Sequence, residues 1–169
     1  MDFSKLTLQD ALDLASLVEE EAQERYNEFA DQLEKHHTTD AATFFRVMSE
    51  NEAKHGAELH ARRIKLFGDV PMNVDRSMLW DVEAPEYAEA RIFMSHRQAL
   101  DVAMDSEKKA YTFFDDALAS ITDPEVKDLF AELRDEELEH QGLVEAEIKK
   151  LGDEADVDPE DYVDAPVGH

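Results

Sequence analysis

The sequence contains no cysteine. This absence excludes disulfide bonds, zinc ribbons, cysteine-held iron–sulfur clusters and thiol nucleophiles. The N-terminal segment 1–5 has no basic region followed by an apolar run, so we expect no secretory signal peptide. No apolar run approaches the roughly 18 residues that a membrane-spanning helix needs. We therefore expect a soluble, cytoplasmic protein without a membrane partner.

Basic residues are scarce as well. The chain has 17 Lys+Arg against 42 Asp+Glu, which gives a formal net charge of -25. Such a chain repels nucleic acid and anionic lipid, so neither is expected as a partner, whereas metal cations suit it. Hydrophobic residues still make up 43% of the 169 residues. That share is too high for a disordered acidic chain, and the length suits a single domain.

Glycine and proline are few and bunched, which leaves long segments free to form helices. Apolar residues at three- and four-residue steps predict helices over 9–34 and 40–67, the first capped by Thr7 with Asp10. Two apparent capping boxes, Ser95-His96-Arg97-Gln98 and Thr122-Asp123-Pro124-Glu125, open further predicted helices. These helices are expected to reach about residues 120 and 151.

The order of these segments favours an all-α, four-helix bundle. Two short loops and one long crossover, 68–94, are typical of that architecture, and no alternating strand pattern of useful length is present. A short helix is expected near 86–91. We predict one domain over 1–152 and a mobile, solvated tail over 153–169 with seven acidic and no basic residues. The apolar crossover residues, including Met78, Leu79 and Trp80, are interpreted as a cover for the bundle or as a contact between copies.

The predicted helices form an internal repeat. A shift of 88 positions overlays the first helix on the third, and a shift of 85 overlays the second on the fourth. The chain thus reads as one helical hairpin used twice. The ionisable residues that survive both overlays are Glu19, Glu52, His55, Glu107, Glu137 and His140.

This set predicts a di-metal site. Each Glu-x-x-His pair shares one helix face, and the other two glutamates lie on the apolar faces of their helices. Four carboxylates in a core repel one another unless they are protonated or neutralised by cations. Two divalent ions balance four negative charges, and an oxygen-rich set with two imidazoles suits iron or manganese better than a structural zinc. One Glu-x-x-His pair alone is a weak signal, so the full set in register carries the prediction.

The motif Glu-Glu-Glu-Ala-Gln-Glu-Arg-Tyr at 19–26, with Glu-x-x-His at 52–55 and 137–140, resembles the ferritin-like di-iron proteins. The resemblance is greatest to the rubrerythrin-like erythrin domains and covers about residues 9–151. It implies a ferritin-like bundle that holds two iron ions, for which manganese or zinc can substitute. It also implies that Glu52 and Glu137 bridge the ions, that Glu19 and His55 complete one ion, and that Glu107 and His140 complete the other.

The same resemblance implies a non-haem di-iron oxidoreductase that reduces hydrogen peroxide or dioxygen. Such an enzyme would act as a peroxidase in the response to oxidative stress. Rubrerythrins commonly carry a four-cysteine rubredoxin domain, which this chain lacks, so we expect a separate electron donor such as a rubredoxin-type protein. A homo-oligomer, preferably a dimer, is expected.

Tyr26 is interpreted mainly as core packing, with a hydrogen-bonding or electron-relay role as the alternative. Ala110 stands where rubrerythrins usually carry a further carboxylate. Ala53 replaces the haem-binding methionine of bacterioferritins, so no haem is expected.

Two alternatives remain open. One is a ferroxidase or iron-storage subunit, which would need a closed shell of many subunits. The other is a helical interaction module without catalysis, whose metal content would not depend on Glu52 or Glu137. The remaining histidines are interpreted as surface residues: His36, His37, His60, His96 and His169.

Overall fold

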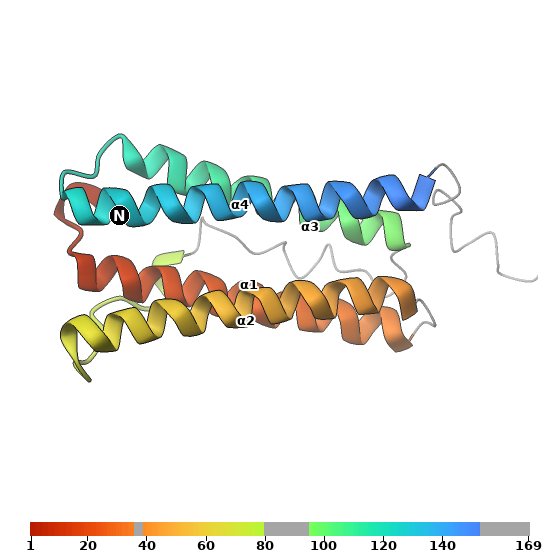
Figure 1. The fold of residues 1–169 in the computed structure, drawn as a ribbon, viewed down its shortest axis with the longest axis horizontal. Coiled ribbons are helices and arrows are strands. Elements are labelled where there is room, and N and C mark those ends of the chain that lie inside the picture. Colours follow the sequence, from red (N-terminus) through yellow and green to blue (C-terminus); the bar gives the residue numbers. More distant parts are fainter. Residues whose placement is uncertain (36–38, 80–94, 153–169) are drawn as a thin grey trace, which may run out of the picture.

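The computed structural model describes residues 1–35, 39–79 and 95–152. These residues form four long helices and two short 3-10 helices and contain no strand: η1 (Phe3–Lys5), α1 (Leu8–Lys35), α2 (Thr39–Phe67), η2 (Arg76–Leu79), α3 (His96–Leu118) and α4 (Pro124–Leu151). The long helices run along one axis (Figure 1). The predicted all-α four-helix bundle is confirmed, and each long helix begins and ends within about two residues of its predicted position.

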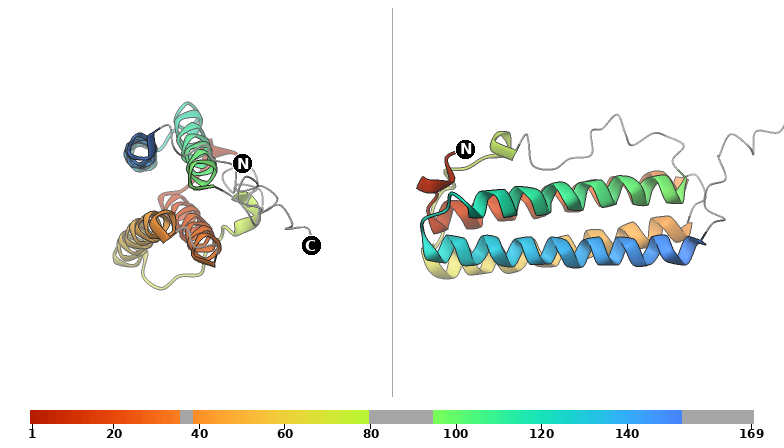
Figure 2. Two further views of the ribbon diagram at one scale, coloured as in Figure 1. Left: turned by 90° about the vertical axis from the view of Figure 1, so that its right-hand side faces the viewer. Right: turned by 90° about the horizontal axis from the view of Figure 1, so that it is seen from above.

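The bundle is built from two helical hairpins. Helix α1 pairs with α2, and α3 pairs with α4, while α1 also contacts α4. The end-on view in Figure 2 shows the α1/α2 hairpin and the α3/α4 hairpin as two layers, one across from the other. None of the helices within 1–35, 39–79 and 95–152 is long and apolar enough to cross a membrane.

The start of α3 follows the sequence pattern. The Ser95 hydroxyl accepts a hydrogen bond from the Gln98 backbone N–H at 3.1 Å, and the Gln98 side-chain oxygen accepts one from the Ser95 N–H at 3.0 Å. The predicted capping box is therefore confirmed. Before α1, the Thr7 hydroxyl donates to Asp10 at 2.7 Å and accepts from the Asp10 N–H at 3.2 Å, which confirms the predicted pair.

The capping box predicted at the start of α4 is wrong. Asp123 caps this helix, because its Oδ1 accepts the backbone N–H groups of Glu125 at 2.8 Å and Val126 at 3.1 Å. The Asp123 carboxylate is a stronger acceptor than a hydroxyl and sits one residue closer to the helix. The Thr122 hydroxyl instead donates to the Ser4 carbonyl at 3.2 Å.

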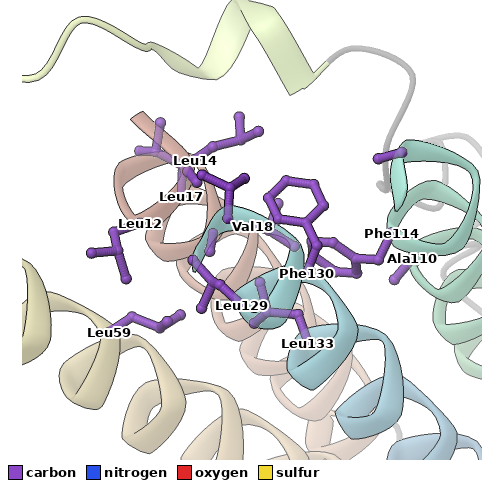
Figure 3. Packing of buried hydrophobic residues seen from close by; sticks show 14 of the residues in the cluster. Leu12, Leu14, Leu17, Val18, Leu59, Ala110, Phe114, Leu129, Phe130 and Leu133 are labelled. Atoms are coloured by element: carbon purple, nitrogen blue, oxygen red, sulfur yellow. The ribbon is translucent and has the colours of Figure 1, made fainter. Parts of the chain in front are cut away.

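The apolar core consists of two clusters at different depths along the bundle. The first joins all four long helices and includes Leu12, Val18, Leu59, Ala110, Phe114, Phe130 and Leu133 (Figure 3). The second includes Tyr26, Phe29, Phe45, Met48, Leu100, Ala103 and Val144. On every long helix, the residues of the predicted site lie in sequence between the members of the two clusters. The core is therefore interrupted by a polar layer at one depth.

The sequence repeat appears in the structure as an approximate two-fold. Leu12 belongs to the first cluster, whereas its repeat counterpart Leu100 belongs to the second. Tyr26 lies in the second cluster, and its counterpart Phe114 lies in the first. Equivalent residues of the two hairpins thus lie at opposite ends of the bundle. The two-fold passes through the polar layer.

A buried ion pair fixes the end of α2 against α1. The Arg63 Nε donates to Asp13 Oδ1 at 2.8 Å, and the two side chains are 3% and 1% exposed. Arg63 also donates to the carbonyls of Gly68, at 2.7 Å, and Val70. Gly68 has a φ of 71°, which glycine adopts without strain, and it ends α2.

The crossover contains η2, which the sequence did not predict. Arg76 donates two hydrogen bonds of 2.9 Å to the carboxylate of Glu24, and Leu79 is buried in the first cluster. Leu79 therefore covers the bundle, as one of the two interpretations of the crossover requires. The expected short helix at 86–91, Trp80 and the tail 153–169 lie outside the described residues.

Candidate metal centre

The six residues that the repeat singled out come together in the polar layer. Glu19, Glu52, Glu107, Glu137 and His140 are each at most 5% exposed, and the His55 side chain is 23% exposed. Together with Glu136, a residue outside the six, their ligand atoms form three groups. Within each group the atoms all lie within 4.8 Å of one another: Glu52, His55 and His140; Glu107, Glu137 and His140; and Glu19, His55 and Glu136. All four long helices contribute to this cluster.

The two imidazoles point their Nδ1 atoms at carboxylates. The His140 Nδ1 lies 3.3 Å from Glu52 Oε1 and 3.4 Å from Glu107 Oε2, and the His55 Nδ1 lies 3.9 Å from Glu19 Oε2. None of these approaches forms an aligned hydrogen bond. Both Nδ1 atoms and the Glu19 Oε2 are buried without a partner.

A buried polar atom without a partner costs on the order of 1–3 kcal/mol. A cation between such atoms removes this cost, because it takes the lone pairs of imidazole nitrogen and carboxylate oxygen together. Four carboxylates and two imidazoles on converging helices are a donor set for a pair of metal ions. The residues present therefore fit a metal centre.

The electrostatics of the carboxylates lead to the same conclusion. Burial raises the pKa of Glu19 well above its ordinary value, and the adjacent Glu52 carboxyl adds to the rise. Burial also raises the pKa of Glu137 well above its ordinary value, with Glu107 adding to it. Without cations these groups take up protons, and metal ions would displace those protons.

The two histidines differ in charge. Burial alone would lower the pKa of His140, but the surrounding carboxylates of Glu107, Glu137 and Glu52 outweigh it and raise that pKa to about 11. Burial, followed by the charge of His140, lowers the pKa of His55. The surroundings of the metal-free cluster therefore favour the charged imidazole at His140 and the neutral imidazole at His55.

A small cavity adjoins the cluster. It has a volume of about 20 Å³, enough for one water-sized molecule, and the four carboxylates line it together with Tyr26, Arg25 and Ser106. Tyr26 is 3% exposed and stacks on Phe45 with ring centroids 5.9 Å apart. Its packing role is confirmed, and it lies in the wall of the cavity as well. Ala110 is fully buried in the first apolar cluster and brings no charge here.

Glu136 also lies beside the cluster, and the repeat in the sequence did not single it out. It is half-buried, and burial, followed by the charge of Glu132, raises its pKa to about 7. The repeat selected residues present in both hairpins, whereas the counterpart of Glu136 under the 85-residue shift is Asn51. Its position next to the Glu-x-x-His pair was the available signal.

One surface interpretation is wrong. The His96 side chain is 12% exposed, and its buried Nε2 lies 4.0 Å from Glu147 of α4. It belongs to the end of the bundle and not to the cluster. His60 is exposed, as expected, whereas His36, His37 and His169 lie outside the described residues.

Comparison with known proteins gives a consistent picture. The family model described as Rubrerythrin matches residues 10–148. The chain is also similar to the crystal structure of an uncharacterized conserved protein from Magnetospirillum magnetotacticum MS-1. The two share 34% sequence identity with a TM-score of 0.70, over 85% of this chain and 95% of that one. No curated protein matches. The predicted ferritin-like fold is thereby confirmed.

Proposed function

The chain belongs to the rubrerythrin family, and from this premise we propose that it is a non-haem di-iron oxidoreductase that reduces hydrogen peroxide or dioxygen with electrons from a separate donor. The observation that supports this proposal most directly is the buried cluster of four carboxylates and two imidazoles with unpartnered Nδ1 atoms. Hard oxygen ligands with two imidazoles favour iron or manganese. When bound, two adjacent iron ions supply one electron each to the oxidant and polarise its oxygen atoms.

Each residue of the cluster has a role in this proposal. Glu52, which shares a ligand group with both histidines, and its repeat counterpart Glu137 would bridge the ions. Glu19 with His55 would hold one ion. The other ion would be held by Glu107 and His140, whose Oε2 and Nδ1 atoms lie 3.4 Å apart. Four carboxylates balance the charge of two divalent ions, which neutralises the layer.

The surroundings of the cluster suit a small oxidant. Apolar clusters flank the polar layer in both directions along the bundle and lower the local dielectric constant, which strengthens electrostatic interactions inside the layer. The cavity of about 20 Å³ admits a molecule of the size of dioxygen or peroxide more readily than an organic substrate. We assign to the Tyr26 hydroxyl a hydrogen bond to the oxidant from the cavity wall.

Electrons have to come from outside the chain. The sequence has no cysteine with which to hold a rubredoxin-type iron centre, so a separate rubredoxin-type protein is the proposed donor. We further propose that the chain acts as a homodimer. Neither nucleic acid nor a membrane is part of the proposal, because the net charge of -25 repels both.

The proposal is tested by loading the protein with Fe(II) without oxygen, desalting it and mixing it with hydrogen peroxide in a stopped-flow spectrometer. We expect about two irons per chain and oxidation of both by one equivalent of peroxide. Size-exclusion chromatography distinguishes the storage alternative. A closed shell of many subunits that retains iron beyond the centre would contradict the proposal, as would a protein that binds no iron.

A further inference from the structure

The two halves of the metal centre differ in their surroundings. Glu136 of α4 has Asn51 as its repeat counterpart on α2. The outer positions differ in the same sense, since the counterparts of Glu58 and Glu132 under the 85-residue shift are Leu143 and Val47. Leu143 and Val47 are 43% and 49% exposed. The repeat therefore places three carboxylates around one half and none at the equivalent positions of the other.

Glu136 reaches atoms that have no partner. One of its carboxylate oxygens lies within 4.8 Å of ligand atoms of both Glu19 and His55. The Glu19 side chain is 97% buried, and neither its Oε2 nor the His55 Nδ1 has a hydrogen-bond partner. Three ligand atoms from α1, α2 and α4 thus converge on one position. Two of the three side chains, Glu19 and His55, carry a buried atom without a hydrogen-bond partner.

The same position opens to the outside. A pocket of about 210 Å³ between α2 and α4 is lined by His55, Glu58, Leu59, Arg62, Glu132 and Glu136, among others. At its outer side, Arg62 lies 3.5 Å from Glu132, and both side chains are more than 40% exposed. The His55 side chain is 23% exposed at this pocket, whereas His140 on the other half is 5% exposed. A cation can approach one half of the centre through carboxylates, while the other half is enclosed.

We propose that Glu136 is a further metal-binding residue, which joins Glu19 and His55 on one divalent cation, and that the pocket between α2 and α4 is the route by which cations enter. This inference rests on the proposed di-metal function and makes its two metal positions unequal. The outer carboxylates of Glu58 and Glu132 attract the cation. Arg62 is ion-paired with Glu132, and an entering cation that binds the Glu132 carboxylate displaces the Arg62 side chain.

The charge of the centre supports an unequal pair. With Glu136 the cluster holds five carboxylates, one more than two divalent cations neutralise. The additional charge lies beside the partly exposed imidazole of His55 and not beside His140. The position of Glu19, His55 and Glu136 is therefore the one that exchanges with solvent. Among the described residues Glu107 and His140 are at most 5% exposed, so we expect their position to be filled from within the centre.

The test is an anaerobic titration of the metal-free protein with Co²⁺, followed by visible absorption and calorimetry. Three proteins are compared: wild type, Glu136→Gln, and the control Glu139→Gln, which removes the same charge from an exposed position of α4. We expect two ions per chain in wild type and in the control. In Glu136→Gln one ion should bind as before, and the affinity for the other should fall on the order of tenfold. Equal helicity of the three proteins is checked by circular dichroism.

The route has its own variant. Glu58→Gln combined with Glu132→Gln changes two exposed side chains, so we expect unchanged stoichiometry and affinity but slower Co²⁺ uptake in stopped-flow mixing. Glu136→Gln that binds both ions as the control does would overturn the role of Glu136, as would loss of both ions. An unchanged uptake rate in the double variant would overturn the route. A wild type that binds no Co²⁺ would instead overturn the di-metal function itself.

Discussion

The imidazole rings of His55 and His140 lie parallel, with 4° between their planes and 5.3 Å between their centroids. The two residues are separated by 85 positions and come from different hairpins. Their parallel arrangement is what an approximate two-fold between the hairpins requires. Each ring turns its Nδ1 toward carboxylates. The two histidines therefore mark the positions of the two metal ions in the proposed centre, one ion beside each ring.

The first prediction concerns metal content. Glu52 Oε1 lies 3.3 Å from the His140 Nδ1, and Glu52 shares a ligand group with both histidines. Glu52→Ala should therefore abolish binding of both ions, and anaerobic Fe(II) loading followed by iron analysis should give about two irons per chain in wild type and in the control variant but not in Glu52→Ala. Glu50→Ala, two residues away and exposed, is the control. Equal iron in all three proteins would contradict the site.

The second prediction concerns the stability of the metal-free protein as the pH changes. The pKa values of Glu19 and Glu137 are raised well above their ordinary values, and that of Glu136 is raised to about 7. A carboxyl group whose pKa is higher in the folded state stabilises the fold fully below its unfolded pKa, about 4.3. This contribution is lost as the pH rises through the folded pKa. In EDTA, the urea midpoint should fall between pH 5 and pH 7.5.

A matched pair of variants separates this effect from general repulsion of the acidic surface. Glu19→Gln removes one buried titrating carboxyl and should flatten the pH dependence. Glu20→Gln removes a charge from an exposed position and should leave the slope unchanged. Identical slopes in these two variants would show that the buried carboxyls are not responsible. With metal bound, the fall should disappear, because cations hold the carboxylates deprotonated.

The third prediction concerns the buried Asp13–Arg63 pair. Asp13→Ala leaves the guanidinium of Arg63 buried beside no anion, so we expect a loss of about 3–5 kcal/mol in the free energy of unfolding. Asp13→Leu combined with Arg63→Met should recover most of that loss. The exposed partner of Arg97, Asp101, gives a control, since Asp101→Ala should cost less than about 1 kcal/mol. Urea denaturation measures all four proteins, and a loss no larger than the control would refute the argument.

The fourth prediction concerns Tyr26. Tyr26→Phe keeps the ring that stacks on Phe45 and removes the hydroxyl of a residue that lines the cavity. Iron content and melting temperature should stay close to those of wild type, while the rate of oxidation by peroxide falls by about tenfold or more. Tyr111→Phe, on a half-buried position of α3, is the control. Oxidation at the wild-type rate would leave Tyr26 with packing alone.

The sequence predicted the fold well where structure is local. Periodicity and caps are set by residues within one helical turn, which is why Ser95 and Gln98 were identified correctly. The capping box predicted at Thr122 was wrong because Asp123, a second possible cap, stands next to it. The Thr122 hydroxyl instead donates to the carbonyl of Ser4, 118 residues away. The prediction that His96 is a surface residue was wrong because its neighbour Glu147 lies on another helix, far away in the sequence. Contacts between segments that are distant in the sequence cannot be predicted from local sequence patterns.

The site was predicted as far as it is symmetric. Glu19, Glu52 and His55 each have an identical counterpart in the second hairpin, so the repeat revealed them. Glu136 has none, because Asn51 stands at its counterpart position. Features that make the halves of the centre different are invisible to a search for what the halves share.

The polar layer has a consequence for a chain without cysteine. No disulfide bond can join distant parts of this sequence. A pair of ions held from Glu19 on the first helix to His140 on the last would cross-link all four helices at mid-length and close very long loops, as a disulfide does in a secreted protein. Removing the metal would then act on this bundle as a reducing agent acts on a disulfide-bonded fold.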